Sequence, residues 1–327
     1  MRRRLGVRHS PVMESYDVLV VGGGAAGLSA ALVLGRARRR VLVVDSGAPR
    51  NAPAAHMHGF LSRDGLPPAE LIHVGRHEVR GYGATMTNRS VSELVKSAGG
   101  FEARLDDGQD VGARKVLVAT GLRDELPDIP GLRERWGTDV LHCPYCHGWE
   151  VRDKVLGVIW NRPDTVRFAN IVRQWTRDLV LFVPNDVLAE ADRPLLATRS
   201  VRVVEGGVER VVVEDDQLTG VLLGDGRTVA LDAVFVPPRL VPNDSLLTGL
   251  GCVRDDLGWV VLGVNGTTSV SGVWAAGNVG NPQAQVITAA GEGSAAAISI
   301  NADLVDDDVR QAVHSVSSSS LLDQGTR

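Results

Sequence analysis

The start of the chain alternates between short apolar runs and one longer helical pattern. Residues 17–21 (DVLVV) form a β-branched run, which predicts a buried strand, and residues 41–44 (VLVV) form a second such run. Between them, residues 28–34 carry alanine and leucine at the spacing of a helix. A strand, a helix and a strand in this order predict a β-α-β unit with parallel strands, and therefore an α/β domain.

A glycine-rich turn joins the first of these strands to the helix. Gly22, Gly24 and Gly27 form a G-x-G-x-x-G pattern, and Asp45 follows the second strand, 21 residues after Gly24. Gly22 permits the tight turn, Gly24 lets a pyrophosphate approach the helix N-terminus, and Gly27 lets the helix pack on the strand. An acidic residue at the position of Asp45 accepts a hydrogen bond from a ribose hydroxyl. The pattern predicts a dinucleotide-binding site.

A second strand-helix-strand pattern occupies the middle of the chain, over residues 155–159, 165–175 and 179–183. Its first turn lacks the glycine fingerprint and reads WNRPDT. Trp160 and Arg162 stand at the two positions where only glycine lets a pyrophosphate reach the helix. We therefore predict the topology of a second dinucleotide-binding unit, with a degenerate binding site.

Composition indicates a globular protein and excludes several functions. The 327 residues suggest about two domains, with 44% hydrophobic residues and a net charge of −4 from 35 Lys and Arg against 39 Asp and Glu. This balance excludes the basic footprint of a protein that binds nucleic acid or a membrane surface. No apolar run approaches the roughly 18 residues of a membrane span, and the arginine-rich start lacks the apolar core of a secretory signal. We expect a cytoplasmic protein whose ends, 1–14 and 306–327, are flexible.

The candidate chemistry lies in residues 141–150 (LHCPYCHGWE), which contain two of the three cysteines. Cys143 and Cys146 can close a disulfide where the chain turns into a helix, and the helix dipole would lower the pKa of the Cys143 thiol. Three other interpretations remain open. C-x-x-C-H is also the attachment pattern of c-type haem, which requires export, and a purely structural pair has the same spacing. A zinc ion needs four tetrahedral ligands, and His142 and His147 are crowded against the cysteines.

The remaining cysteine and three tryptophans have simpler interpretations. Cys252 lies in an apolar context, so we expect a buried and inert thiol. Trp149, Trp160 and Trp175 are expected to pack against neighbouring elements and not to line a substrate pocket.

Two further motifs, residues 116–121 (VLVATG) and 270–278 (VSGVWAAGN), each read as a strand that ends in a tight glycine turn. Together with the first fingerprint they resemble the flavoproteins with two dinucleotide-binding domains, and specifically the low-molecular-weight thioredoxin reductases. The resemblance extends over residues 16–304. It implies an α/β fold with two Rossmann-like domains: a discontinuous FAD domain over residues 1–123 and 252–327, and an inserted NADPH-type domain over residues 124–251 that carries the C-x-x-C pair.

This resemblance also implies which residues contact FAD. They lie in the glycine turn, after the second strand, in the A-T-G turn and near the C-terminal glycine motif: Gly22, Gly24, Ala25, Ala26, Gly27, Asp45, Asn51, His58, Ala119, Thr120, Gly121, Gly277, Asn278, Gln285 and Val286. Asn278 stands where the family usually has aspartate, so one charge near the flavin phosphates is absent. His58 has a second interpretation, as an ordinary surface or packing histidine.

The resemblance assigns roles to the cysteine pair as well. In the family the second cysteine faces the flavin and the first meets the substrate, which carries over to Cys146 and Cys143. His147 stands where the family has an acid/base aspartate. An imidazole, with an ordinary pKa of about 6.5, can accept a thiol proton at neutral pH. The alternative is a histidine that merely caps a turn.

The degenerate second site changes the expected function. The basic residues that hold the 2′-phosphate in the family are replaced by residues 184–186 (PND), so we expect FAD as cofactor, no NADPH and no metal. The C-P-Y-C-H-G-W-E segment resembles the dithiol oxidases of natural-product clusters, which close disulfides in gliotoxin, holomycin and related compounds. This resemblance implies an oxidase that acts on a small-molecule dithiol with O2, releases H2O2 and forms a homodimer. The alternatives are a disulfide reductase with another electron donor, a redox-sensing flavoprotein, and an NADPH-dependent reductase with an unusual nicotinamide site.

Overall fold

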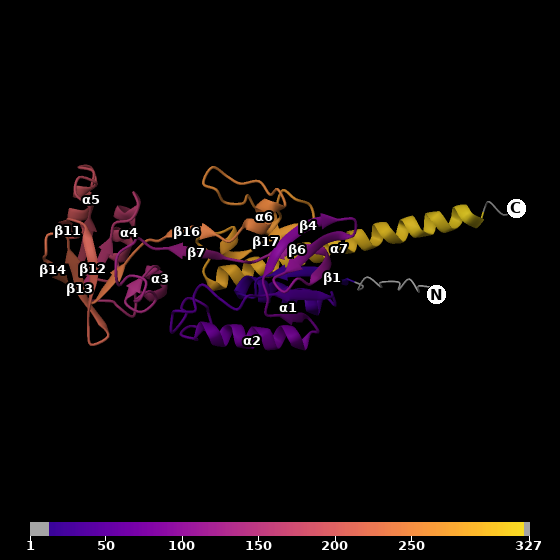
Figure 1. Cartoon of the computed structure of the whole chain (residues 1–327), viewed down its shortest axis with the longest axis horizontal. Coiled ribbons are helices and arrows are strands. Elements are labelled where there is room, and N and C mark those ends of the chain that lie inside the picture. Colours follow the sequence, from indigo (N-terminus) through magenta and orange to yellow (C-terminus); the bar gives the residue numbers. More distant parts are fainter. Residues whose placement is uncertain (1–12, 324–327) are drawn as a thin grey trace, which may run out of the picture.

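The computed structural model describes residues 13–323, so most of the segment 1–14 that we expected to be flexible lies outside the described residues. The molecule is elongated, with two lobes joined by a pair of strands and one long helix that projects from the far side (Figure 1). Among the described residues, no helix has the length and apolar character needed to cross a bilayer.

The first lobe is built on a seven-stranded sheet of order β3-β2-β1-β6-β5-β4, in which β17 pairs with the C-terminal end of β6 on the same edge as β5. Its strands are β1 (Glu14–Val21), β2 (Val41–Val44), β3 (Thr85–Thr87), β4 (Val91–Ser97), β5 (Gly100–Leu105), β6 (Asp110–Val118) and β17 (Val273–Ala275). Strands β1, β2, β3, β6 and β17 are parallel, whereas β4 and β5 form an antiparallel extension. Both predicted strands of the first unit are present, and β2 has the predicted bounds.

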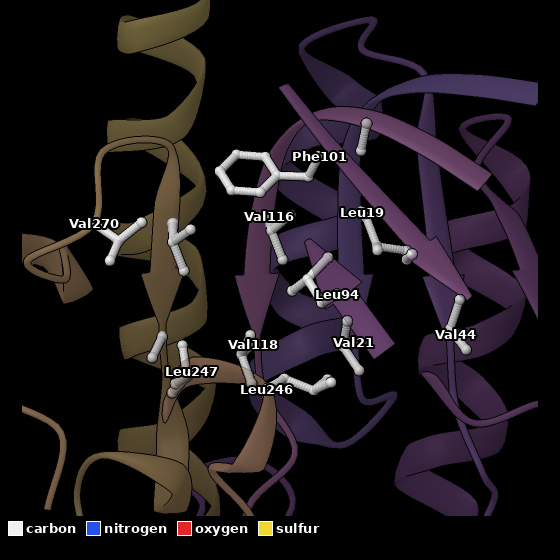
Figure 2. Packing of buried hydrophobic residues seen from close by; sticks show 14 of the residues in the cluster. Leu19, Val21, Val44, Leu94, Phe101, Val116, Val118, Leu246, Leu247 and Val270 are labelled. Atoms are coloured by element: carbon white, nitrogen blue, oxygen red, sulfur yellow. The ribbon is translucent and has the colours of Figure 1, made fainter. Parts of the chain in front are cut away.

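Helices cover one face of this sheet and a second hydrophobic core fills the other. The helices of this lobe are α1 (Ala25–Arg36), α2 (Pro68–Gly81), α6 (Ser245–Gly249) and α7 (Val286–Asp323), with short 3-10 turns η1 (Val264–Gly266) and η2 (Gly277–Val279). Val18 and Val20 face α1 and α7, whereas Leu19 and Val21 point to the opposite core. Figure 2 shows that opposite core, where Leu246 of α6 lies near Val118 and Val21. Burial on both faces explains why these strands read as continuous apolar runs.

The second lobe contains a parallel sheet of order β11-β10-β9-β15-β8. Its elements are β8 (Val140–Leu141), α3 (Pro144–His147), β9 (Leu156–Ile159), α4 (Thr165–Val172), β10 (Leu179–Val183), α5 (Arg193–Ala197), β11 (Arg202–Glu205) and β15 (Ala233–Phe235). A three-stranded antiparallel sheet of β12 (Val208–Glu214), β13 (Gln217–Leu223) and β14 (Thr228–Ala230) packs on the other face. The predicted two-Rossmann fold, with the first domain split by the second, is confirmed.

Two antiparallel strands, β7 (Leu122–Glu125) and β16 (Arg239–Pro242), connect the lobes. The chain leaves the first lobe where the sequence predicted, but it returns earlier than residue 252. Leu246 and Leu247 of α6 are buried in the core of the first lobe, because α6 packs beside the sheet directly after β16. The boundary therefore lies near Asn243.

The tail at 306–327 that we expected to be flexible is helical as far as Asp323, as the end of α7, and residues 324–327 lie outside the described residues. Two acidic residues of this segment contact basic side chains of β6 and of the turn between α1 and β2. Asp307 lies 2.8 Å from Lys115, and Asp308 lies 2.6 Å from Arg114 and 2.9 Å from Arg39. Beyond these contacts the helix projects from the body of the molecule (Figure 1).

Candidate redox site

The first glycine turn has the geometry that a dinucleotide cradle requires. Gly22 adopts a φ of 105°, and a Cβ there would lie 2.3 Å from the Ala119 carbonyl oxygen. A Cβ on Gly27 would lie 1.9 Å from the Gly22 oxygen, so the helix touches the turn. Gly24 is the N-cap of α1, and a Cβ there would meet no atom within 4 Å. The N-terminus of α1 therefore opens into free space, where its N–H groups can bind a pyrophosphate.

That space belongs to a large cavity of about 2040 Å³ between the lobes. It is lined by every residue predicted to contact FAD except Gly27, which packs behind the turn. The same cavity reaches Cys143, Cys146 and His147. The residues present fit an FAD across the first lobe, with the cysteine pair facing the same space.

Asp45 lies against the glycine turn at the end of β2, where a Cβ on Gly23 would come within 2.7 Å of its carboxyl group. Arg76 of α2 forms an ion pair with this carboxylate and lines the same cavity. The sequence analysis missed Arg76, because nothing in the amphipathic pattern of α2 marks one arginine as facing β2.

Asn278 organises the far edge of the cavity. Its side-chain amide donates hydrogen bonds to the carbonyl oxygens of Asn281 and Ala284, each at 2.9 Å. Glu292 of α7 accepts hydrogen bonds from the Gly277 amide at 2.8 Å and from the Asn281 side chain at 2.6 Å. An aspartate at position 278 has no N–H to donate, so asparagine holds the 281–284 loop in a way that the usual family residue does not.

The A-T-G turn is held by the chain that returns from the second lobe. The Thr120 hydroxyl donates to the Asn243 carbonyl oxygen at 2.6 Å, and the Asn243 side chain donates to the Thr120 carbonyl oxygen at 3.0 Å. Gly121 adopts a φ of 68°, which favours glycine at this position.

Cys143 and Cys146 form a disulfide with a Cα–Cα distance of 5.2 Å, as predicted. Cys143 is the N-cap of the short helix α3, and Pro144 occupies its first position, where a missing N–H has no cost. His147 ends the helix, and its backbone N–H donates to the Cys143 carbonyl oxygen at 3.1 Å. Cys252 is buried and forms no disulfide. Burial raises the pKa of its thiol, which agrees with the predicted inert role.

Two histidines flank the disulfide in different environments. Burial lowers the pKa of His147; the Glu150 carboxylate opposes this shift and His58 adds to it. His147 is therefore neutral at neutral pH and able to accept a proton. Burial, reinforced by Arg50, lowers the pKa of His142 to about 4.

Arg50 connects the first lobe to the segment before the disulfide. Its guanidinium forms two hydrogen bonds of 2.7 Å with the Asp124 carboxylate and lies 3.4 Å from Nδ1 of His142. On its other side His142 stacks on Trp136, with ring centroids 6.4 Å apart. The sequence analysis singled out neither Arg50 nor Asp124, which are 74 residues apart.

His58 lies where the first lobe meets the segment after α3. Its Nε2 is 3.4 Å from Glu150 and its Nδ1 is 3.4 Å from Asp64. His58 lines the large cavity, so its predicted place near the flavin and its contact with Glu150 coexist. Whether it contacts FAD stays a prediction, as do the other FAD contacts.

The tryptophans differ in their surroundings. Trp160 packs against the core of the second lobe, and Trp175 meets the edge of Tyr145 at 5.5 Å between ring centroids. The packing prediction is wrong for Trp149, which is 65% exposed and carries the Arg152 guanidinium 3.9 Å above its ring. Trp149 lies just after the C-cap of α3, and its side chain is exposed beside the Cys143–Cys146 disulfide.

In the second Rossmann-like domain, side chains of the turn between β9 and α4 form hydrogen bonds with nearby carbonyl oxygens. The Asn161 amide donates to the Pro237 carbonyl oxygen at 3.0 Å, and Arg162 donates to the Pro238 carbonyl oxygen at 3.3 Å. The hydroxyl of the fully buried Thr165 donates to the Arg162 carbonyl oxygen at 2.6 Å. These side chains thus join the turn before α4 to residues 237 and 238, where a glycine turn would carry no side chain, and Asn161 and Arg162 also line the large cavity.

A split α/β domain with an intact dinucleotide turn, a second Rossmann-like domain and a C-x-x-C disulfide facing the shared cavity define a disulfide oxidoreductase of the flavoprotein type. The chain matches the pyridine nucleotide-disulphide oxidoreductase family over residues 16–159 and 182–293, and it belongs to this family. The family binds FAD.

Individual relatives are similar along most or part of the chain. The crystal structure of HlmI has 53% sequence identity and a TM-score of 0.91, over 97% of this chain and 100% of that one. Thioredoxin reductase sirT of Leptosphaeria maculans is 30% identical over 88% of this chain and 93% of that protein. A probable thioredoxin reductase of Arthroderma benhamiae is 35% identical, over 51% of this chain and 43% of the relative's length.

Proposed function

We propose that this protein is a cytoplasmic, FAD-dependent dithiol oxidase. It closes an intramolecular disulfide in a small natural-product dithiol of the holomycin kind and passes the electrons to O2. The proposal is supported by the Cys143–Cys146 disulfide, by the open cradle at Gly24 and by the similarity to HlmI.

One observation carries the choice of an oxidase over an NADPH-dependent reductase. The turn at residues 160–165 is tied to the Pro237 and Pro238 carbonyl oxygens by Asn161 and Arg162, whereas the first turn is open at Gly24. A pyrophosphate needs close backbone approach at a helix N-terminus, and the side chains of Asn161 and Arg162 oppose such an approach. A protein that binds no nicotinamide can take its electrons from the substrate dithiol, which favours the oxidase.

The chain's own residues account for the thiol chemistry. His147 takes the proton from a substrate thiol. The resulting thiolate attacks Cys143 and breaks the Cys143–Cys146 bond, and Cys146 leaves as a thiolate. The second substrate thiol loses its proton and attacks the mixed disulfide, which releases the product and the Cys143 sulfur. Two substrate S–H bonds break, one product S–S bond forms, and the enzyme disulfide gains two electrons. The chemistry that bound FAD supplies is transfer of these two electrons to O2, which yields H2O2.

The second candidate is a disulfide reductase that uses a donor other than NADPH. Two relatives carry the name thioredoxin reductase, and Tyr145 and Trp149 are both exposed beside the disulfide, which suits contact with a protein surface. A redox sensor, the third alternative, would be reduced once by a dithiol and would not turn over.

The test is oxygen consumption by the purified protein with a small dithiol, and separately with NADPH alone. We expect catalytic oxygen uptake with the dithiol and none with NADPH. Cys143→Ser should abolish uptake and keep the flavin absorbance, whereas Cys252→Ala, at the buried cysteine outside the site, should retain uptake. Flavin bleaching by NADPH with little dithiol oxidation would instead establish a reductase.

A further inference from the structure

The proposed reaction places a demand on proton transfer that one histidine does not meet alone. Each product disulfide requires two substrate thiols to lose their protons, because the thiolate is the attacking species. A neutral imidazole accepts one proton at a time. The Cys146 thiolate that the first attack releases can take one of these two protons, so one proton for each product disulfide has to leave His147.

The segment after His147 leads to a second histidine on the other lobe. Glu150 follows α3 and lies 3.4 Å from Nε2 of His58, while Nδ1 of the same ring lies 3.4 Å from Asp64. The Gly59 backbone N–H donates to Asp64 at 2.8 Å and holds that carboxylate beside the ring. Along the series Glu150, His58 and Asp64 the side chains are 43%, 23% and 67% exposed, so Asp64 at the end is the most open to solvent.

We propose that Glu150 and His58 are positioning residues that, with His147, form a proton path from the Cys143–Cys146 disulfide to solvent at Asp64. The inference rests on the proposed oxidase for the direction of proton flow, which is outward during dithiol oxidation. The disulfide is contributed by one lobe and His58 by the other, so the path is complete only when the two lobes are in contact.

The charges around His147 support this direction. The Glu150 carboxylate favours the protonated imidazole, whereas a charge on His58 disfavours it. A proton on His58 therefore disfavours a proton on His147 and returns that ring to its neutral form, in which it can accept a proton from the next substrate thiol. The other titratable groups nearby are His56, whose ring lies 6.5 Å from that of His58, and His142 on the far side of the disulfide.

Anaerobic reduction of the flavin by dithiothreitol, followed across pH, tests the path. His58→Gln keeps a hydrogen-bonding side chain that does not titrate, and we expect roughly tenfold slower bleaching. The pH midpoint should move in opposite directions: downward in Glu150→Gln, which removes a negative charge near His147, and upward in His58→Gln, which removes a positive one. His77→Gln and Glu78→Gln, exposed on α2 and outside the cavity, are the matched controls and should behave like wild type.

Alkylation by iodoacetamide separates failure of this path from failure of the proposed function. Protein reduced with a phosphine is alkylated at the cysteine pair across pH, without dithiol, flavin reduction or oxygen. We expect the same opposite displacement of the pH midpoint in Glu150→Gln and His58→Gln. Wild-type midpoints in both variants would overturn the proton path, whatever the oxidase assay shows. If the alkylation midpoints of the variants are displaced but dithiols do not reduce the protein, the proton path stands and the proposed oxidase is rejected.

Discussion

At the scale of single residues, the environment of His147 sets its chemistry. Burial lowers its pKa, so the ring is neutral and basic at neutral pH, whereas an ordinary thiol with a pKa of about 8.5 still holds its proton there. At a pH between the pKa of His147 and that of the substrate thiol, the thiol is still protonated and needs a base. His147 is neutral in this range and can accept the proton.

His147→Ala should therefore reduce dithiol-dependent oxygen uptake by roughly a hundredfold in this window. The loss should shrink as the pH rises through the pKa of the substrate thiol, because the thiolate then forms without help. The measurement is the pH–rate profile of the variant beside wild type. A variant whose deficit is the same at every pH would assign His147 a structural role.

Asn278 leads to a second prediction at this scale. Asn278→Asp removes two donated hydrogen bonds to the 281–284 loop, which should cost about 1–3 kcal/mol of stability, and it places a negative charge near the predicted flavin phosphates. We expect a lower melting temperature and less flavin retained after gel filtration. Unchanged flavin content and melting temperature would show that the loop does not depend on this amide.

The residues that the sequence marked and those it did not differ in kind. Gly22, Gly24 and the Cys143–Cys146 pair are readable, because their roles depend on spacing within one turn. Arg50 and Arg76 were not, because each is defined by a carboxylate that the fold brings to it from a distant segment. No local pattern carries that information.

At the scale of elements, the contact between α1 and α7 depends on glycine. A Cβ on Gly293 would lie 2.0 Å from the Ala26 carbonyl oxygen, whereas a Cβ on Gly291, one half-turn away, would meet nothing within 4 Å. The end of α7 was expected to be a flexible tail, because its acidic segment read alone resembles one; only the fold places Lys115, Arg114 and Arg39 beside it.

These two glycines form a matched pair of variants. Gly293→Ala should force α7 away from α1 and destabilise the protein by about 1–3 kcal/mol. Gly291→Ala should stabilise it by up to about 1 kcal/mol, because alanine is the better helix former and the site is open. Chemical denaturation of both variants measures the difference, and equal effects would contradict the close packing of the helices.

At the scale of the whole molecule, two domains were predicted and two are present, yet the return to the first lobe was placed too late. Helix α6 follows the connecting strand β16 directly, and Leu246 and Leu247 belong to the core of the first lobe. Nothing in the apolar pattern of α6 tells which lobe it joins. Domain membership of a short helix is a property of packing and not of its own sequence.

We also propose that the protein is a homodimer, as the resemblance to thioredoxin reductases implies. Ile298, Val305 and Val309 are exposed at helical spacing on α7, beside the α7 residues that pack in the core of the first lobe. We expect light scattering to give the mass of two chains, and Val305→Asp combined with Val309→Asp to give one. Val213→Asp, an exposed valine on the second lobe, is the control and should stay dimeric. A wild-type mass of one chain would reject the dimer.

The shared cavity between the lobes has a consequence for the order of events during turnover. The predicted flavin residues and the Cys143–Cys146 pair line one space. Under the proposed function, the reduced pair and the flavin would hold two electrons in that space after the oxidised product has left. Oxygen would then react in a separate step, so the two substrates would not need to be bound together. Such an enzyme is a double-displacement catalyst, whose affinity for one substrate is set independently of the other.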